Sequence, residues 1–331
     1  MILSMLIPPS DAEAKLALAS QMGIKHAITK AAPELTGKAP PYDFEVFKKI
    51  KEDFEKAGFK LTGLEGDQFD MSPIKLGLPN RDEWIEKYQQ MLRNMGKLGV
   101  NLLCLNWMVS VGWFRSSVET PIRGGAMTTS FDYSKTPAQL DDPSLMISEE
   151  KVRENLFYFL DAVLPVAEEA GVKMGLHPDD PPLSPLCGVG RILTSAENYE
   201  KVLSRYNSEN LGVTFCQATF KLMGEDLKKI SSDWIARKKI FFIHIRDTEG
   251  DARKFTEMFI DEDKGFVADM FAHYRDCGFD GVIRSDHAPA MYGETQKTFG
   301  GGISVGYQML GHLFSYGYIK GCCDSLKIPL E

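Results

Sequence analysis

Two histidines, one cysteine and one aspartate follow or close apolar runs in the second half of the sequence. The stretches read "KMGLHPDDPP", "GVTFCQA", "IFFIHIRD" and "RSDHAP". Their side chains offer nitrogen, sulfur and oxygen donors, a mixture that suits Zn²⁺, Fe²⁺ or Mn²⁺ better than Ca²⁺ or Mg²⁺. One such residue alone is usually a core side chain, whereas four at successive strand ends predict a transition-metal site. The predicted ligands are His177, Cys216, His244 and Asp286.

Further polar residues lie near these four in the sequence. His287 directly follows the aspartate, and Tyr307 comes after a glycine-rich stretch at 300–302 that we interpret as a lid hinge. Arg246 is two residues past the second histidine, so strand alternation turns both side chains to the same side. A guanidinium there is suited to binding a carboxylate through two N–H groups. The alternatives are a solvated loop position for His287 and a core position for Tyr307.

The loop after the first histidine is stiff. The prolines in "HPDDPP" hold the preceding residues away from helical angles, so the loop is expected to fix the direction of His177. We expect Asp179 and Asp180 to cap or support this loop rather than to act in catalysis. Arg284, two residues before the predicted aspartate ligand, is expected to be a structural partner at the same rim.

Short apolar runs alternate with amphipathic segments along the whole chain. In the segment 43–57 the apolar residues follow the spacing of one helix face, and helices are also predicted at 81–98 and 148–170. Several of these segments end in glycine just before the next apolar run, as expected at a helix terminus. Strands are predicted at 2–7, 24–28, 59–64, 101–106, 172–176, 211–215, 240–245 and 279–284.

Eight alternations of strand and helix predict an α/β fold with a closed (β/α)8 TIM barrel. A doubly wound open sheet is the competing fold, but it usually carries a glycine-rich turn after its first strand. Here that turn is "IPPSDAE". We therefore predict one barrel domain over residues 1–331, with an enlarged loop at about 107–147. In such a barrel the residues just past the strands meet at one mouth, where the four predicted ligands would converge.

The composition narrows the function classes. A net charge of −8 disfavours a nucleic-acid binder, which needs a basic face, but still permits a small anionic substrate at a local cationic site. No segment approaches the roughly 18 consecutive apolar residues of a membrane-spanning helix, and the N-terminus reads as a strand rather than a signal peptide. The six cysteines lack metal-type CxxC or disulfide-framework spacing, so we expect a cytoplasmic protein.

The motifs "LHPDDPP", "FCQ", "IHIRD" and "RSDHAPAMYGE", followed by "GY", resemble the mannonate dehydratase family in order and spacing. The resemblance runs from about residue 172 to the end of the chain. Upstream, "LCLNWMVSVGWFR" is similar to a segment that the family writes "CYNFMPVFDWTR". Four ordered motifs over nearly half the chain make this a specific signal.

The resemblance implies a metal-dependent, xylose isomerase-like TIM barrel that converts D-mannonate to 2-keto-3-deoxy-D-gluconate and water. It implies Mn²⁺ as the metal, with Fe²⁺, Co²⁺ or Zn²⁺ as alternatives, bound by the four residues named above. It places the acid/base pair on His287 and Tyr307. We assign Arg246, Arg115 and Trp113 to substrate binding, and we expect a homo-oligomer, either a dimer or a tetramer.

This chain departs from the family pattern around the substrate. The N-terminal "FRWYG"-type segment is missing, "HFRN" is replaced by a sequence ending in Asp247, and "RPDHGR" is replaced by "RSDHAP". These changes alter the expected substrate contacts more than the metal site. Two alternatives therefore stay open: a sugar or sugar-acid isomerase or epimerase on the same metal barrel, and a non-catalytic aldonate-binding protein.

Overall fold

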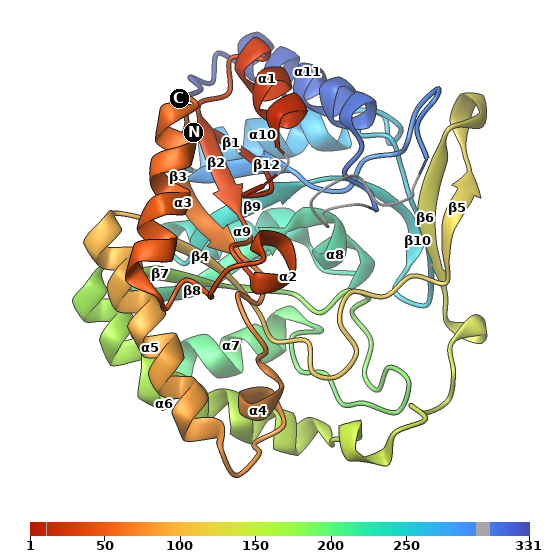
Figure 1. The fold of residues 1–331 in the computed structure, drawn as a ribbon. Coiled ribbons are helices and arrows are strands. Elements are labelled where there is room, and N and C mark those ends of the chain that lie inside the picture. The colour runs from red at the N-terminus through yellow and green to blue at the C-terminus, as the bar shows by residue number, and fades with distance from the viewer. Residues whose placement is uncertain (11, 296–304) are drawn as a thin grey trace.

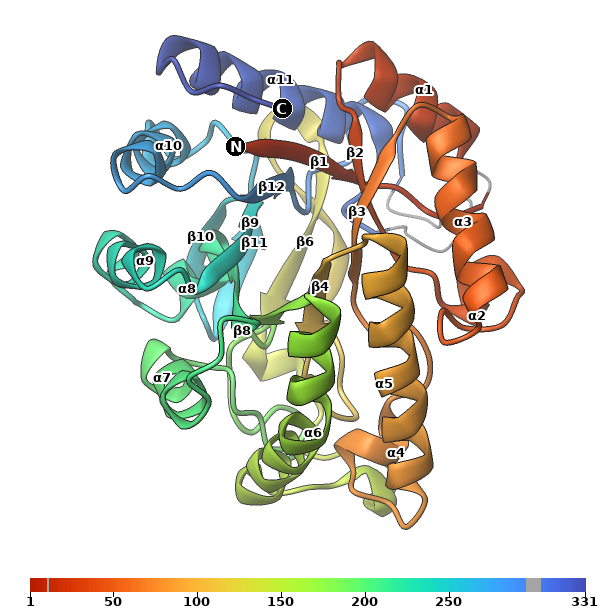
Figure 2. The ribbon, with the colours of Figure 1, turned by 90° about the vertical axis from the view of Figure 1, so that its left-hand side faces the viewer.

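Eight parallel strands close into a barrel with helices around its outside (Figures 1 and 2). The computed structural model describes residues 1–10, 12–295 and 305–331. Around the barrel the strand order is β1-β12-β9-β8-β7-β4-β3-β2. Each strand overlaps one of the eight predicted runs, so the predicted barrel is confirmed. The strands are β1 (Ile2–Leu6), β2 (His26–Thr29), β3 (Lys60–Glu65), β4 (Leu102–Asn106), β7 (Lys173–His177), β8 (Leu211–Cys216), β9 (Ile240–Ile245) and β12 (Val282–Ser285).

The three predicted helices are present, and capping chemistry sets their ends. α3 (Phe44–Lys56) begins at Asp43, whose carboxylate accepts the N–H of Val46. α6 (Glu149–Ala170) ends at Gly171, whose φ of 67° glycine adopts without strain. The other helices are α1 (Glu13–Gln21), α2 (Pro33–Thr36), α4 (Ser72–Lys75), α5 (Arg81–Leu98), α7 (Ala196–Arg205), α8 (Gln217–Leu222), α9 (Leu227–Ala236), α10 (Phe266–Asp276) and α11 (Met309–Ser325). None of the described helices is both long and apolar enough to cross a membrane.

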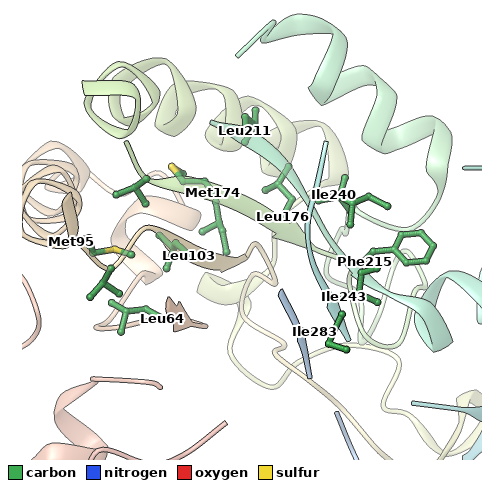
Figure 3. Close-up of a cluster of buried hydrophobic side chains, with 14 of the residues drawn as sticks. Leu64, Met95, Leu103, Met174, Leu176, Leu211, Phe215, Ile240, Ile243 and Ile283 are labelled. Carbon is green, nitrogen blue, oxygen red and sulfur yellow. The ribbon is translucent and has the colours of Figure 1, made fainter. Parts of the chain in front are cut away.

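The main hydrophobic core lies between the strands and the surrounding helices. Alternation along each strand sends one set of side chains outward to this core and the other set into the barrel. In β4, Leu103 and Leu105 belong to the outer core, whereas Leu102 and Cys104 belong to a smaller cluster with Phe242. Figure 3 shows part of the outer core, with Leu64, Met95, Leu103, Met174, Leu176, Leu211, Phe215, Ile240, Ile243 and Ile283 labelled.

The predicted enlarged loop contains strands of its own. β5 (Ser117–Pro121) and β6 (Met127–Asp132) pair with each other, and β6 also pairs with β11 (Lys254–Glu257), which follows the seventh barrel strand. β10 (Thr248–Asp251) completes a four-stranded antiparallel sheet beside the barrel (Figure 1). Reading 107–147 as loop alone was incomplete, because these strands are short and rich in polar residues. Short 3-10 helices lie at Arg123–Gly125, Tyr133–Lys135 and Pro143–Leu145.

Candidate metal centre

The four predicted ligands come from strands that are neighbours in the barrel. His177 and Cys216 are the last residues of β7 and β8, His244 lies one residue before the end of β9, and Asp286 follows β12. Cys216 is in register with His244 across the β8–β9 pair. All four side chains are buried, and one donor atom from each lies within 4.8 Å of the others. The parallel strands thus bring together nitrogen, sulfur and oxygen donors from four separate sequence positions.

A hydrogen bond orients the ring of His177, and two carboxylates flank the ring of His244. Nδ1 of His177 lies 2.8 Å from the carbonyl oxygen of Pro178. A carbonyl only accepts, so Nδ1 carries the proton and Nε2 is left as the donor atom for a metal. In His244, Nδ1 lies 3.7 Å from Oδ2 of Asp286, while Nε2 faces Oε2 of Glu65 at 3.5 Å. A carboxylate behind a ligating histidine is the usual arrangement for holding such a ring in place.

The aspartate divides its two oxygens between the predicted ligands and the rest of the site. Oδ2 of Asp286 lies 3.7 Å from Sγ of Cys216 and accepts a 2.9 Å hydrogen bond from Nε of Arg246. Oδ1 accepts hydrogen bonds from Tyr307 at 2.6 Å and faces Arg284 at 3.1 Å. Oδ2 is therefore the oxygen that faces the other donor atoms.

The pKa shifts of two of the donors, Asp286 and His177, favour the forms that bind a metal. Burial would raise the pKa of Asp286, but the charges of His287, Arg284 and other neighbours hold it well below its ordinary value. Burial lowers the pKa of His177. An ionised carboxylate and a neutral imidazole are the forms that coordinate a metal ion.

Charge balance gives a second test of fit. Three arginines (Arg115, Arg246 and Arg284) contact four carboxylates (Asp180, Glu257, Glu65 and Asp286) around this centre. The carboxylates exceed the guanidinium groups by one, and a thiolate at Cys216 would add a second negative charge. A divalent cation would neutralise both, and buried charge is costly when it is not compensated.

Arg284 pairs with Glu65 at the rim of the barrel, in keeping with the structural role expected for it. Glu65 was not identified from the sequence as its partner. The Arg284 side chain is buried and donates a 2.9 Å hydrogen bond from Nε to Oε2 of Glu65. Burial alone would raise the pKa of Glu65, but Arg284 and His244 lower it to about 2. Because Glu65 ends β3, the strand-end rule that identified the ligands would also have found it, had it been applied to the first half of the chain.

Arg115 and Arg246, both predicted to bind substrate, are held by two shared carboxylates. Arg115 forms two hydrogen bonds with Asp180, at 2.6 and 2.9 Å, and another with Glu257. Arg246 donates from Nη1 to Glu257 at 2.7 Å and from Nη2 to Asp180 at 2.7 Å. Every nitrogen of Arg246 donates to a protein oxygen, with Thr219 as the remaining partner. Their direct contact with substrate stays a prediction.

The two predicted acid/base residues lie side by side. The ring centroids of His287 and Tyr307 are 5.3 Å apart, and Trp113 packs against His287 at 5.1 Å. Nδ1 of His287 lies 3.4 Å from Oε1 of Glu257. Burial raises the pKa of the Tyr307 phenol well above its ordinary value. The predicted lid hinge at 300–302 lies outside the described residues.

The two aspartates of the proline-rich loop have different partners. Oδ2 of Asp179 accepts the backbone N–H groups of Ile192 and Leu193 at 3.1 and 2.8 Å, which is the predicted capping role. Asp180 instead joins the two arginines described above. Asp247, the carboxylate that departs from the family motif, pairs with Lys221 at 2.7 Å. It lines a cavity of about 440 Å³. None of the four predicted ligands lines that cavity.

A cavity of about 250 Å³ opens beside the metal centre, at the carboxyl ends of β1 to β4. Glu65 belongs both to its wall and to the contacts of the metal centre. Trp113 also lines it, and its predicted contact with substrate stays a prediction. Sequence reasoning missed the other polar residues of its wall, which are Lys30, Asp67, Lys75 and Asn106.

Comparison with known proteins identifies the family. The family model described as D-mannonate dehydratase (UxuA) matches residues 11–146 and 138–329. The chain belongs to the mannonate dehydratase family. Within that family, a mannonate dehydratase from Brachyspira hyodysenteriae is 32% identical over 342 residues, covering 92% of each protein. The resemblance seen in the motifs is therefore confirmed over most of the chain.

Solved structures agree with this membership. The crystal structure of mannonate dehydratase from Streptococcus suis serotype 2 matches with a TM-score of 0.87 at 30% identity, covering 98% of this chain and 95% of that one. A xylose isomerase domain protein from Planctomyces limnophilus matches with a TM-score of 0.53 at 13% identity, over 86% and 90% of the two chains. That lower likeness concerns the fold alone and confirms the predicted xylose isomerase-like barrel.

Proposed function

We propose that this member of the mannonate dehydratase family removes water from D-mannonate to give 2-keto-3-deoxy-D-gluconate. The observation that supports this most strongly is the set of four buried donor atoms within 4.8 Å of one another. They lie beside His287 and Tyr307, two groups able to exchange protons. The relatives of the chain are named mannonate dehydratases. A metal centre next to a proton-transfer pair is what elimination of water from a hydroxy acid needs.

His177, Cys216, His244 and Asp286 are the residues that we propose hold the metal. We propose Mn²⁺, although Fe²⁺, Co²⁺ and Zn²⁺ accept the same donors. When bound, such an ion acts as a Lewis acid that stabilises the negative charge developing on the substrate carboxylate and C2 oxygen. Glu65 holds the His244 ring and Arg246 holds the Asp286 carboxylate.

The reaction breaks the C2–H bond and the C3–O bond, and the two fragments leave as water. One of His287 and Tyr307 takes the C2 proton, and the other gives a proton to the departing C3 hydroxyl. The electron pair of the C–H bond forms the C2–C3 double bond of an enol, which becomes the keto acid. Each positioned acid or base typically contributes 10²- to 10⁴-fold in rate.

The ion-pair cluster behind these residues fixes their positions. Arg115 and Arg246 are anchored by Asp180 and Glu257, and Glu257 also faces His287 at 3.4 Å. Preorganised charges of this kind act on the reacting centre without having to reorient during the reaction. The predicted homo-oligomer and cytoplasmic location stay predictions.

The test is a keto-acid assay of the metal-loaded protein against a panel of five- and six-carbon aldonates. We expect keto acid from D-mannonate and loss of the activity on chelation. Binding of aldonates with neither keto acid nor exchange of the C2 hydrogen would overturn the proposal in favour of a binding protein. Interconversion of sugars without loss of water would overturn it in favour of an isomerase or epimerase.

A further inference from the structure

Two polar side chains in the cavity beside the metal centre have no hydrogen-bond partner. Asn106 is the last residue of β4, and its Oδ1 is buried. Nε1 of Trp113, in the following loop, is buried as well. Within residues 1–10, 12–295 and 305–331, neither atom finds a donor or acceptor. An unsatisfied buried polar atom is destabilising, and both residues line the cavity, so a ligand there that reached these two atoms would satisfy them.

The chemistry of this pair fits a hydroxylated ligand. The indole N–H of Trp113 only donates, whereas the amide oxygen of Asn106 only accepts. A hydroxyl group does both, so a chain of hydroxylated carbons can satisfy the two atoms together. A hydroxyl also fits if the Asn106 amide is turned over, because it then accepts from the amide nitrogen.

The charged groups of the same cavity are already paired. Nζ of Lys75 lies 2.6 Å from Asp67, and Nζ of Lys30 lies 2.6 Å from Glu34. A second anionic group, such as a phosphate, would have to compete with these carboxylates for the lysines. The cavity therefore favours an uncharged polar chain over a phosphorylated one.

The cavity is joined to the proposed reaction site. Glu65 lines the cavity and lies 3.5 Å from Nε2 of His244. The Trp113 ring packs against His287 at 5.1 Å and under the Arg115 guanidinium at 4.6 Å. Bond breaking concerns only C1 to C3, so a six-carbon acid must place three further hydroxylated carbons nearby. A volume of about 250 Å³ is several times the roughly 30 Å³ that one water molecule occupies.

We propose that Asn106 and Trp113 recognise hydroxyl groups on the substrate carbons beyond C3 and so select the length and hydroxylation of the sugar acid. Trp113 donates to one hydroxyl oxygen, and Asn106 accepts from a hydroxyl hydrogen. This inference rests on the proposed function, because it takes a sugar acid as the occupant. A site built to hydrogen-bond a hydroxyl discriminates strongly against an analogue that lacks it, because its own polar atoms are then left unpaired.

The experiment compares D-mannonate with analogues that lack the hydroxyl at C4, C5 or C6, one at a time. The variants are Trp113→Phe, which keeps an aromatic ring against His287, and Asn106→Leu, with Asn106→Ser as a smaller change in case the leucine does not fold. Trp84→Phe on the outer helix α5 is the matched control. Calorimetry measures binding to each metal-loaded protein in a Tyr307→Phe background, in which turnover is expected to be slow, and the keto-acid assay of the same substitutions with Tyr307 present measures kcat/KM.

We expect the unchanged protein to bind at least one deoxy analogue about tenfold more weakly than D-mannonate. Trp113→Phe and Asn106→Leu should each weaken D-mannonate binding about tenfold and leave binding of that analogue nearly unchanged, while Trp84→Phe preserves the preference. Folded, metal-loaded variants that keep the full preference would overturn the inference, as would tighter binding of a 6-phosphorylated analogue. Because binding is measured without turnover, a protein that binds D-mannonate but makes no keto acid disproves the proposed function and not this recognition.

Discussion

The hydroxyl of Tyr307 donates a 2.6 Å hydrogen bond to Oδ1 of Asp286. This contact joins a proposed proton-transfer residue to a proposed metal ligand that lies 21 positions earlier in the chain. Arg284 lies 3.1 Å from the same oxygen and Arg246 holds Oδ2, so the carboxylate keeps both arginines if the phenol is removed. The two roles of this part of the site can therefore be separated by mutation.

We expect Tyr307→Phe to lower kcat about 10²- to 10⁴-fold, because a positioned acid or base is removed. Metal content should stay unchanged, since Arg284 still holds Asp286. Steady-state kinetics together with elemental analysis checks both parts. Loss of the metal along with activity would show that the phenol supports the ligand rather than the proton transfer.

For His287→Asn we expect a similar loss of keto-acid formation with aldonate affinity retained. Deuterium exchange at C2 then separates the two proton transfers. If His287 is the acid, the variant still exchanges the C2 hydrogen without releasing water, whereas loss of the base abolishes exchange. A variant with unimpaired turnover would remove His287 from the mechanism.

Cys216→Ser should weaken metal binding, because a hydroxyl replaces a soft thiolate. Cys322→Ala, on α11 away from the four ligands, is the matched control and should bind metal as the unchanged protein does. Competition with a metal-sensitive dye measures the affinity, and the metal-dependent rise in melting temperature gives an independent reading. Equal affinities for both variants would exclude Cys216 as a ligand.

Glu257→Gln should destabilise the metal-free protein at neutral pH by about 3–5 kcal/mol, because it breaks the buried ion pairs that Glu257 forms with Arg115 and Arg246. Burial alone would raise the pKa of Glu257, but Arg246 and Arg115 lower it from 4.5 to about 2. The unfolded chain therefore takes up this proton at a higher pH than the folded chain. The stability that the ionised group contributes is present above the ordinary pKa and is lost as the pH falls towards 2.

The difference in the free energy of unfolding between Glu257→Gln and the unchanged protein should therefore become smaller as the pH falls. Urea unfolding at neutral pH and at about pH 3 measures it. Exposed Glu249 provides the control, since Glu249→Gln should change the free energy of unfolding little at either pH. A difference that stays constant with pH would show that the pKa of Glu257 is the same in the folded and the unfolded chain.

Much of the site could be predicted because successive strands of a parallel barrel are mostly neighbours, and their carboxyl ends lie at the same mouth. His177, Cys216 and Asp286 each follow an apolar run, and the ends of neighbouring strands meet at one mouth. Periodicity and terminal glycines located the helices for a similar reason, because both signals are local in the sequence. Local signals of this kind need no knowledge of distant contacts.

The residues that sequence reasoning missed depend on distant contacts. Glu257 lies on β11, a strand of four residues in a polar segment, and it reaches Arg115 from 142 positions away. A strand of four residues is too short to show a clear alternation of polar and apolar residues. Its partner β6 also lies in another loop, so no local turn signals the pairing. The pairing of Arg246 with Asp180 also joins loops 66 positions apart. The sequence therefore predicted Arg246 as a substrate-binding residue without showing that its donors have protein partners.

The small antiparallel sheet ties together two insertions that most barrels could vary independently. β5 and β6 come from the loop after the fourth barrel strand, β10 and β11 come from the loop after the seventh, and the Arg115–Glu257 ion pair crosses between them. Replacement of either segment alone would break the pairing of β6 with β11 and the buried Arg115–Glu257 ion pair, unless the new segment supplied matching partners. The two segments thus depend on each other, and a redesign of specificity in this protein would have to replace them together.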